Sequence, residues 1–121
     1  QVVKGWLDAS GETHEQVHDV AWSGGRKPGK DGKVPLVGST VDLANATWTN
    51  TIGAPELIAV WKDPAFDAKQ RAFYYARVIE IPTPRWTAYD QVRFGLKMSP
   101  EVPMTQQERA WTSPIWYTPG E

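Results

Sequence analysis

Residues 72–81 read Ala-Phe-Tyr-Tyr-Ala-Arg-Val-Ile-Glu-Ile, the longest run of β-branched and aromatic residues in the chain. Such a composition favours a β-strand, and the prolines that follow the run oppose a helix that continues past it. A helix is the competing interpretation, because Phe66, Phe73 and Arg77 also fit a helical stripe. The run is apolar on both faces except for Arg77 and Glu80, so we interpret it as a central strand.

Four further runs have the composition of short strands and are bounded by Gly, Pro, Asp or Asn. They are residues 2–7, 17–22, 56–61 and 110–117. With the central strand they predict an all-β domain: a single β-sandwich, immunoglobulin-like or similar, with long loops and one or two short helical turns. A small closed barrel is the alternative. In the sandwich we expect these side chains to be buried: Phe73, Tyr75, Val78, Trp111 and Ile115.

The size of the chain, 121 residues and 13.6 kDa, suits one domain over residues 1–121. Area scaling predicts a folded surface of about 6,600 Å² against about 19,700 Å² for the unfolded chain. Hydrophobic residues make up 40% and charged residues 22%, which argues against disorder and against a membrane span. The formal net charge of −1 argues against a nucleic-acid-binding module, which carries a basic excess.

Cysteine is absent, which excludes disulfides, a thiolate nucleophile and a Cys-based zinc site. The absence is compatible with the cytosol and with an oxidising compartment, so it predicts no location. No segment resembles a signal or transit peptide, and the chain opens at Gln1 directly into a strand-like run. We expect it to be the C-terminal domain of a longer polypeptide.

Two segments between the strands have helical signals. In residues 63–70, Asp63 followed by Pro64 predicts a single helical turn. In the long excursion over residues 82–108, the two prolines of Pro-Thr-Pro at 82–84 hold the chain extended. A short helical turn over residues 87–94, ended by Gly95, is expected after them.

The same excursion carries the candidate contact residues Arg85, Trp86 and Tyr89. An arginine flanked by aromatic residues on a stiff segment is typical of an interface anchor or an anion contact. We therefore interpret these three residues as an interface or ligand contact. The alternative is a loop that folds back to cover one end of the sandwich.

Catalytic and metal-binding motifs are not recognisable. His14 and His18 are the only histidines, and on an extended segment about 13 Å would separate them, too far for one ion. There is no Gly-x-Ser-x-Gly elbow, P-loop or Gly-x-Gly-x-x-Gly. We expect no catalytic residue, no metal ligand and no cofactor in these residues.

Seven tryptophans in 121 residues allow a second interpretation, a sugar-binding face. Such a face needs two or three exposed rings, whereas most tryptophans in a small sandwich pack in the core. Trp86 is the one that we expect to be exposed.

Five stretches of the sequence are similar to one protein family. They are residues 3–8, 17–23, 49–57, 70–86 and 108–117. The most specific are Phe-Tyr-Tyr-Ala-Arg-Val at 73–78 and Ala-Trp-Thr-Ser-Pro-Ile-Trp at 110–116. Together they resemble the C-terminal region of the DUF3604 family of uncharacterised bacterial proteins, over nearly the whole chain.

That family resembles the PHP (polymerase and histidinol phosphatase) superfamily of metal-dependent phosphoesterases, whose His and Asp metal motifs lie in the N-terminal part. The resemblance implies that this chain is a non-catalytic accessory domain, packed on a missing N-terminal hydrolase domain that holds a divalent metal. The alternative is a free-standing ligand-binding module, most plausibly for a glycan. Coplanar exposed aromatic rings would favour the module, and a large apolar surface without a pocket would favour the accessory domain.

Overall fold

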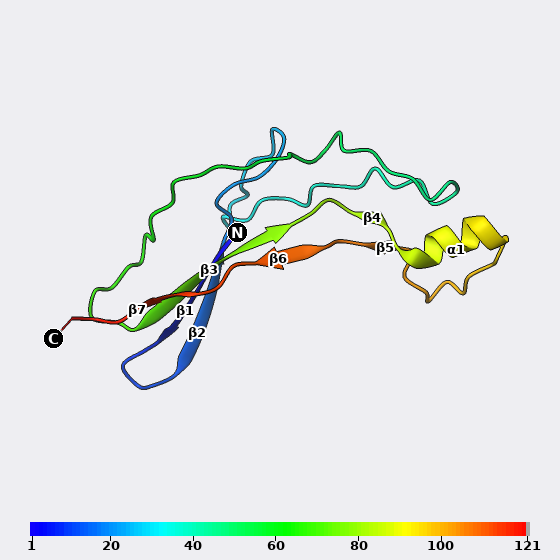
Figure 1. Cartoon of the computed structure of the whole chain (residues 1–121). Coiled ribbons are helices and arrows are strands. Elements are labelled where there is room, and N and C mark those ends of the chain that lie inside the picture. Colours follow the sequence, from blue (N-terminus) through cyan, green and yellow to red (C-terminus); the bar gives the residue numbers. More distant parts are fainter. Residues whose placement is uncertain (121) are drawn as a thin grey trace.

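The computed structural model describes residues 1–120 and is organised around a five-stranded antiparallel sheet (Figure 1). In this sheet β1 (Val2–Leu7) lies between β2 (Thr13–His18) and β3 (Ala72–Ile79). The other edge of β3 pairs with two short strands, β6 (Arg109–Trp111) and β7 (Ile115–Tyr117). A separate ribbon pairs β4 (Thr83–Pro84) with β5 (Thr105–Gln106), and the helix α1 (Trp86–Phe94) lies between them in sequence.

The expected fold class is confirmed: the chain is all-β with antiparallel sheets and one short helix, consistent with a small sandwich-like fold. The strand predicted at residues 2–7 has those bounds, and β3 ends two residues before the predicted end. The last predicted strand is divided into β6 and β7, because Pro114 and its neighbours interrupt the pairing with β3.

Two strand predictions are wrong. Residues 56–61 are extended but pair with no strand among the described residues. The strand expected at 17–22 is instead β2, which begins four residues earlier and is polar and exposed along most of its length. A turn decides its position: the Asp8 carboxylate accepts the backbone N–H groups of Ser10 and Glu12, which places Thr13 opposite Leu7.

The register of the strands gives the five-stranded sheet two faces, because residues opposite each other in a ladder point the same way. We call one the covered face; it carries Lys4, Trp6, His14, His18, Tyr74 and Tyr117. We call the other the aromatic face; it carries Leu7, Val17, Phe73, Tyr75, Trp111 and Trp116.

A segment of irregular chain, residues 61–68, forms the layer over the covered face. Asp63 forms a salt bridge with Lys4, and Trp61 packs on His18 and Tyr74. The hydroxyl of Tyr117 donates to the carbonyl of Ala68 at 3.0 Å. The helical turn predicted over 63–70 is wrong, because the aspartates of this segment cap tight turns through backbone N–H groups two residues on.

The accessible surface of the chain is 9213 Å², against about 6,600 Å² expected for a compact protein of this mass. The predicted core is correspondingly wrong. Val78, Trp111 and Ile115 are 56%, 60% and 73% exposed, and Phe73 and Tyr75 are only half-buried. Phe73, Tyr75 and Trp111 lie on the aromatic face, which has no opposing layer within residues 1–120. Val78 and Ile115 lie on the covered face, where residues 61–68 do not bury them.

The excursion over 82–108 forms an arm rather than a cap on the sheet. β4 is extended as predicted. α1 packs against β4 and lies at the opposite end of the molecule from β1, β2 and β7 (Figure 1). The predicted end of the helix at Gly95 is confirmed, since Gly95 adopts the left-handed conformation with φ 64°. α1 is nine residues long, and no helix in the described part of the chain could cross a membrane.

Candidate functional site

The three predicted contact residues come together at the first turn of α1. Arg85 is the N-cap residue, with extended backbone angles, and its carbonyl accepts the N–H of Ala88. Trp86 and Tyr89 lie three residues apart on one helix face, and both side chains are exposed. Within the described residues the Arg85 guanidinium has no hydrogen-bond partner. The start of α1, next to β4, therefore presents one cation and two aromatic rings.

The arm holds this turn in place through its own contacts. The N–H of Arg85 donates to the carbonyl of Met104 at 2.9 Å, and the buried hydroxyl of Thr87 donates to the carbonyl of Pro103 at 2.6 Å. At the other end, Gly95 and the bond from Leu96 N–H to the Gln91 carbonyl close the helix. The exposed side chains thus stand on a fixed backbone.

A larger exposed surface is the aromatic face of the sheet. The rings of Phe73 and Trp116 lie 5.2 Å apart at an angle of 48°, while those of Phe73 and Tyr75 are nearly parallel at 6.4 Å. Trp116 is 72% exposed, and Trp111 stands opposite Arg77 farther along β3. Of these rings, Phe73, Tyr75 and Trp111 were predicted from the sequence to be buried in a core. The sequence signal that could have separated the faces is the period of two in a strand, which puts Phe73 and Tyr75 on one face and Tyr74 and Ala76 on the other.

The covered face holds a buried polar cluster that the sequence reasoning missed. The Lys4 ammonium lies 2.7 Å from Asp63 Oδ2 and donates to the Ala65 carbonyl at 2.8 Å. The Tyr74 hydroxyl donates to the same Asp63 oxygen at 2.8 Å. Both side chains of the ion pair are almost fully shielded from water. The available sequence signal was Lys4, a lysine that stands among the apolar residues of β1.

The environment of this cluster shifts two titrations. Burial by itself opposes ionisation of Asp63, but the hydrogen bonds from Lys4 and Tyr74 outweigh it and hold the pKa of Asp63 below its usual value. Burial, followed by the hydrogen bond to Asp63, raises the pKa of Tyr74 to about 12. The charged carboxylate and the neutral phenol are therefore the stable forms.

One group of metal-ligating side chains occurs in residues 1–120: Asp8, Glu12 and His14 at the β1–β2 turn. Its chemistry fits the turn better than an ion. Asp8 Oδ1 accepts three hydrogen bonds from Ser10 and Glu12, and Asp8 Oδ2 lies 2.8 Å from His14 Nε2. Those bonds, led by the one from the Ser10 hydroxyl, hold the pKa of Asp8 well below its usual range.

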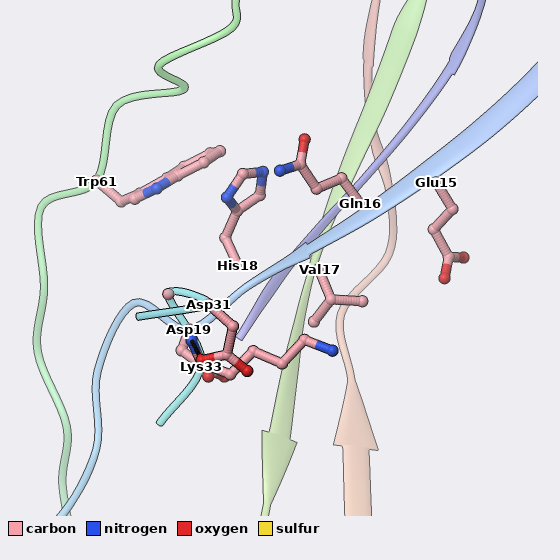
Figure 2. Close-up of a pocket in the computed structure, with 9 residues that line it drawn as sticks. Glu15, Gln16, Val17, His18, Asp19, Asp31, Lys33 and Trp61 are labelled. Carbon is pink, nitrogen blue, oxygen red and sulfur yellow. Dashed lines mark hydrogen bonds between the residues drawn. The ribbon is translucent and has the colours of Figure 1, made fainter. Parts of the chain in front are cut away.

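The two histidines face different partners, as extended geometry requires. His14 stacks on Trp6 at 5.2 Å, whereas His18 lies 4.9 Å from Trp61. His18 points toward Trp61 beside a shallow hollow of about 440 Å³, and Val17 points to the opposite side of β2 (Figure 2). Both carboxylate oxygens of Asp19 in this hollow already accept bonds, from the Gln1 amide and from Val34 N–H. The Asp19 carboxylate is therefore already occupied, whereas the buried Nε2 of His18 has no hydrogen-bond partner among the described residues.

Comparison with known proteins gives one match. A family model described as "Protein of unknown function (DUF3604)" matches residues 1–119. No curated protein matches the chain, and no solved structure matches it.

Proposed function

The chain belongs to the DUF3604 family, and on this premise we propose that it is a non-catalytic accessory part of a larger DUF3604 protein. Its aromatic face packs against another part of the same polypeptide. The observation that carries the proposal is the exposure of Trp111 and Trp116 on a sheet face without an opposing layer. Monomeric proteins rarely leave such a patch in water, so it marks an interaction surface.

The amount of exposed surface is adequate for a stable interface. The chain exposes about 2,600 Å² more than a compact monomer of its mass would. An interface of standard size needs only about 800 Å² from each partner. Aromatic rings that form a desolvated centre supply most of the binding free energy in such contacts.

The partner in this proposal is the part of the polypeptide that carries the chemistry, a metal-dependent hydrolase similar to the PHP phosphoesterases. Its catalytic groups and its divalent metal lie outside residues 1–121. The support is the family resemblance, together with the hydrogen bonds that already occupy Asp8 in the one metal-ligating group of the described residues.

The first turn of α1 makes the second contact with that partner. Arg85 supplies a cation, and Trp86 and Tyr89 supply apolar area on a rigid turn. In the longer protein, Arg85→Ala or Trp86→Ala lowers domain association or hydrolase activity. Neither substitution moves the melting temperature of residues 1–121, because both side chains project from the arm. The reverse pattern would give the first turn of α1 a purely structural role.

A glycan-binding module is the second candidate, and the same rings discriminate against it. Sugar rings stack on exposed aromatic rings that lie flat in one plane. Phe73 and Tyr75 are nearly parallel but half-buried, and the exposed Trp116 is tilted by 48° from Phe73. The tilt suits interdigitated packing of side chains, as in a protein interior.

Hydroxyl-radical footprinting of the tryptophans tests the proposal. Trp111 and Trp116 are expected to react readily in residues 1–121 and several-fold more slowly in a longer DUF3604 polypeptide that contains them. Trp116→Arg should loosen the longer protein toward proteolysis, while Leu36→Arg, an exposed position off the sheet, should not. Equal reactivity of both tryptophans in the two proteins contradicts the proposal, and protection only by added oligosaccharide favours the glycan module.

A further inference from the structure

Residues 56–61, Glu-Leu-Ile-Ala-Val-Trp, have the composition of a strand but lie outside every sheet. Ile58 is 82% exposed and Val60 is fully exposed. Leu57 is also exposed, on the other side of an extended chain. Apolar side chains therefore project in both directions from residues 57–60 and are exposed in residues 1–120, and only Trp61 at the end of the segment packs on the sheet.

The backbone of this segment is equally without partners. Between residues 54 and 62, no backbone N–H or carbonyl forms a hydrogen bond with another described residue. Strands need such bonds, and an unpaired strand edge is a template for pairing with another chain. A polar loop would satisfy its backbone with water, but this segment cannot do so without exposing its apolar side chains.

Both ends of the segment are fixed to the rest of the fold. Before it, the carbonyl of Ile52 accepts the buried Ser23 hydroxyl at 2.7 Å, and Gly53 lies against Ile81. At its end, Trp61 packs on His18, and two residues later Asp63 forms the buried ion pair with Lys4. The green trace that carries the segment runs apart from the strands between these two anchors (Figure 1).

We propose that residues 56–61 are a strand that joins the edge of a β-sheet located elsewhere in the same DUF3604 polypeptide. The partner sheet has an apolar layer against each of its two faces, so that a strand added at its edge is buried on both sides. Strands buried on both faces are near-continuous apolar runs rather than alternating ones, which is the pattern of Leu-Ile-Ala-Val. Main-chain hydrogen bonds supply the affinity, and pockets for Ile58 and Val60 supply the specificity.

A second copy of the chain fits this segment less well. Antiparallel pairing of two such segments would satisfy one backbone edge of each. Leu57 and Ala59 on one side, and Ile58 and Val60 on the other, would stay in water. An edge between two apolar layers satisfies both requirements at once.

The inference rests on the proposed packing against the rest of the polypeptide but uses a different surface, so the two can fail separately. Hydrogen exchange followed by mass spectrometry compares residues 1–121 with the longer DUF3604 protein. The amides of residues 57–60 are expected to exchange at least about 100-fold more slowly in the longer protein than in residues 1–121. Equal, fast exchange in both proteins overturns the inference, even where footprinting shows that Trp111 and Trp116 are protected.

Proline substitutions give an independent measurement in the longer protein. Ile58→Pro and Ala59→Pro each remove one N–H, so at least one of them should restore fast exchange to the neighbouring amides. Leu36→Pro, in an exposed irregular segment, is the matched control and should leave that protection unchanged. Retained protection in both variants overturns the inference. A dimer in analytical ultracentrifugation that dissociates on dilution, with loss of the protection, also overturns the inference. A second copy of the chain would then be the partner.

Discussion

The ammonium group of Lys4 lies 2.7 Å from the carboxylate of Asp63, and the two side chains are 3% and 6% exposed. Fifty-nine positions separate them in sequence. The pair therefore connects the central part of the sheet to the segment over residues 61–68, and that segment is the layer over the covered face. The position of the exposed strand-like segment that precedes Trp61 depends on the same connection.

Substitution of one member of this pair should be far more harmful than substitution of both. Lys4→Met leaves a buried carboxylate without a counter-ion, and we expect a loss of about 3–5 kcal/mol in the free energy of unfolding. The double variant Lys4→Met/Asp63→Leu should lose much less than the sum of the single variants. Urea unfolding measures the coupling, with the exposed Lys30→Met as control. Additive losses would contradict a buried pair.

Acid should weaken the attachment of residues 61–68. The folded-state pKa of Asp63 lies below the unfolded-state value, so its contribution to stability is present above about pH 4 and is lost as the pH falls through the folded-state pKa. The urea midpoint of the wild-type chain should therefore fall more steeply below about pH 4 than that of Asp63→Asn. Parallel pH profiles would show that Asp63 contributes nothing to the acid response.

Alkali should act on the same cluster through Tyr74, whose pKa is raised to about 12. The neutral phenol is the stabilising form, so its contribution is complete below about pH 10 and is lost as the pH rises toward the folded-state pKa. Absorbance titration of the four tyrosines should show one that ionises last. Tyr74→Phe should remove that late step, and a late step that survives the substitution would assign it to another tyrosine.

A close approach on the aromatic face predicts the effect of a single methyl group. The Phe73 ring lies over Gly5, where an added Cβ would come within 2.5 Å of Cε1. We expect Gly5→Ala to destabilise the chain by about 1–3 kcal/mol, because the ring has to move. Gly25→Ala, where a Cβ meets nothing within 4 Å, should change stability by less than about 0.5 kcal/mol. Equal effects in thermal unfolding would contradict the packing of Phe73 on Gly5.

Residues 1–121 alone should not hydrolyse a chromogenic phosphodiester, with or without Mn²⁺ or Zn²⁺. Asp8, the centre of the one metal-ligating group in residues 1–120, already accepts bonds from the turn that it closes. Turnover that needs the metal and disappears in His14→Ala would contradict this expectation. Glu12→Asn would then show whether the whole group takes part.

Local features of the chain were predictable from sequence because their causes are local. The β-branched and aromatic residues of β1 and β3 favour an extended backbone through their own side chains. Proline fixed the extended backbone of β4, and a glycine in the left-handed conformation fixed the end of α1. The contact residues Arg85, Trp86 and Tyr89 were brought together because a helix places residues three or four apart on one face.

Burial and pairing were decided by the tertiary structure alone. Composition predicted that Trp111 and Ile115 are core residues, but an apolar strand residue is buried only where another layer covers its side chain. Residues 56–61 have strand composition and no partner edge, and the polar β2 has the partner that its sequence does not predict. Lys4 is buried because Asp63 reaches it from a distant segment. Backbone conformation depends on a residue and its neighbours, whereas burial and hydrogen bonding depend on what the rest of the chain brings against it.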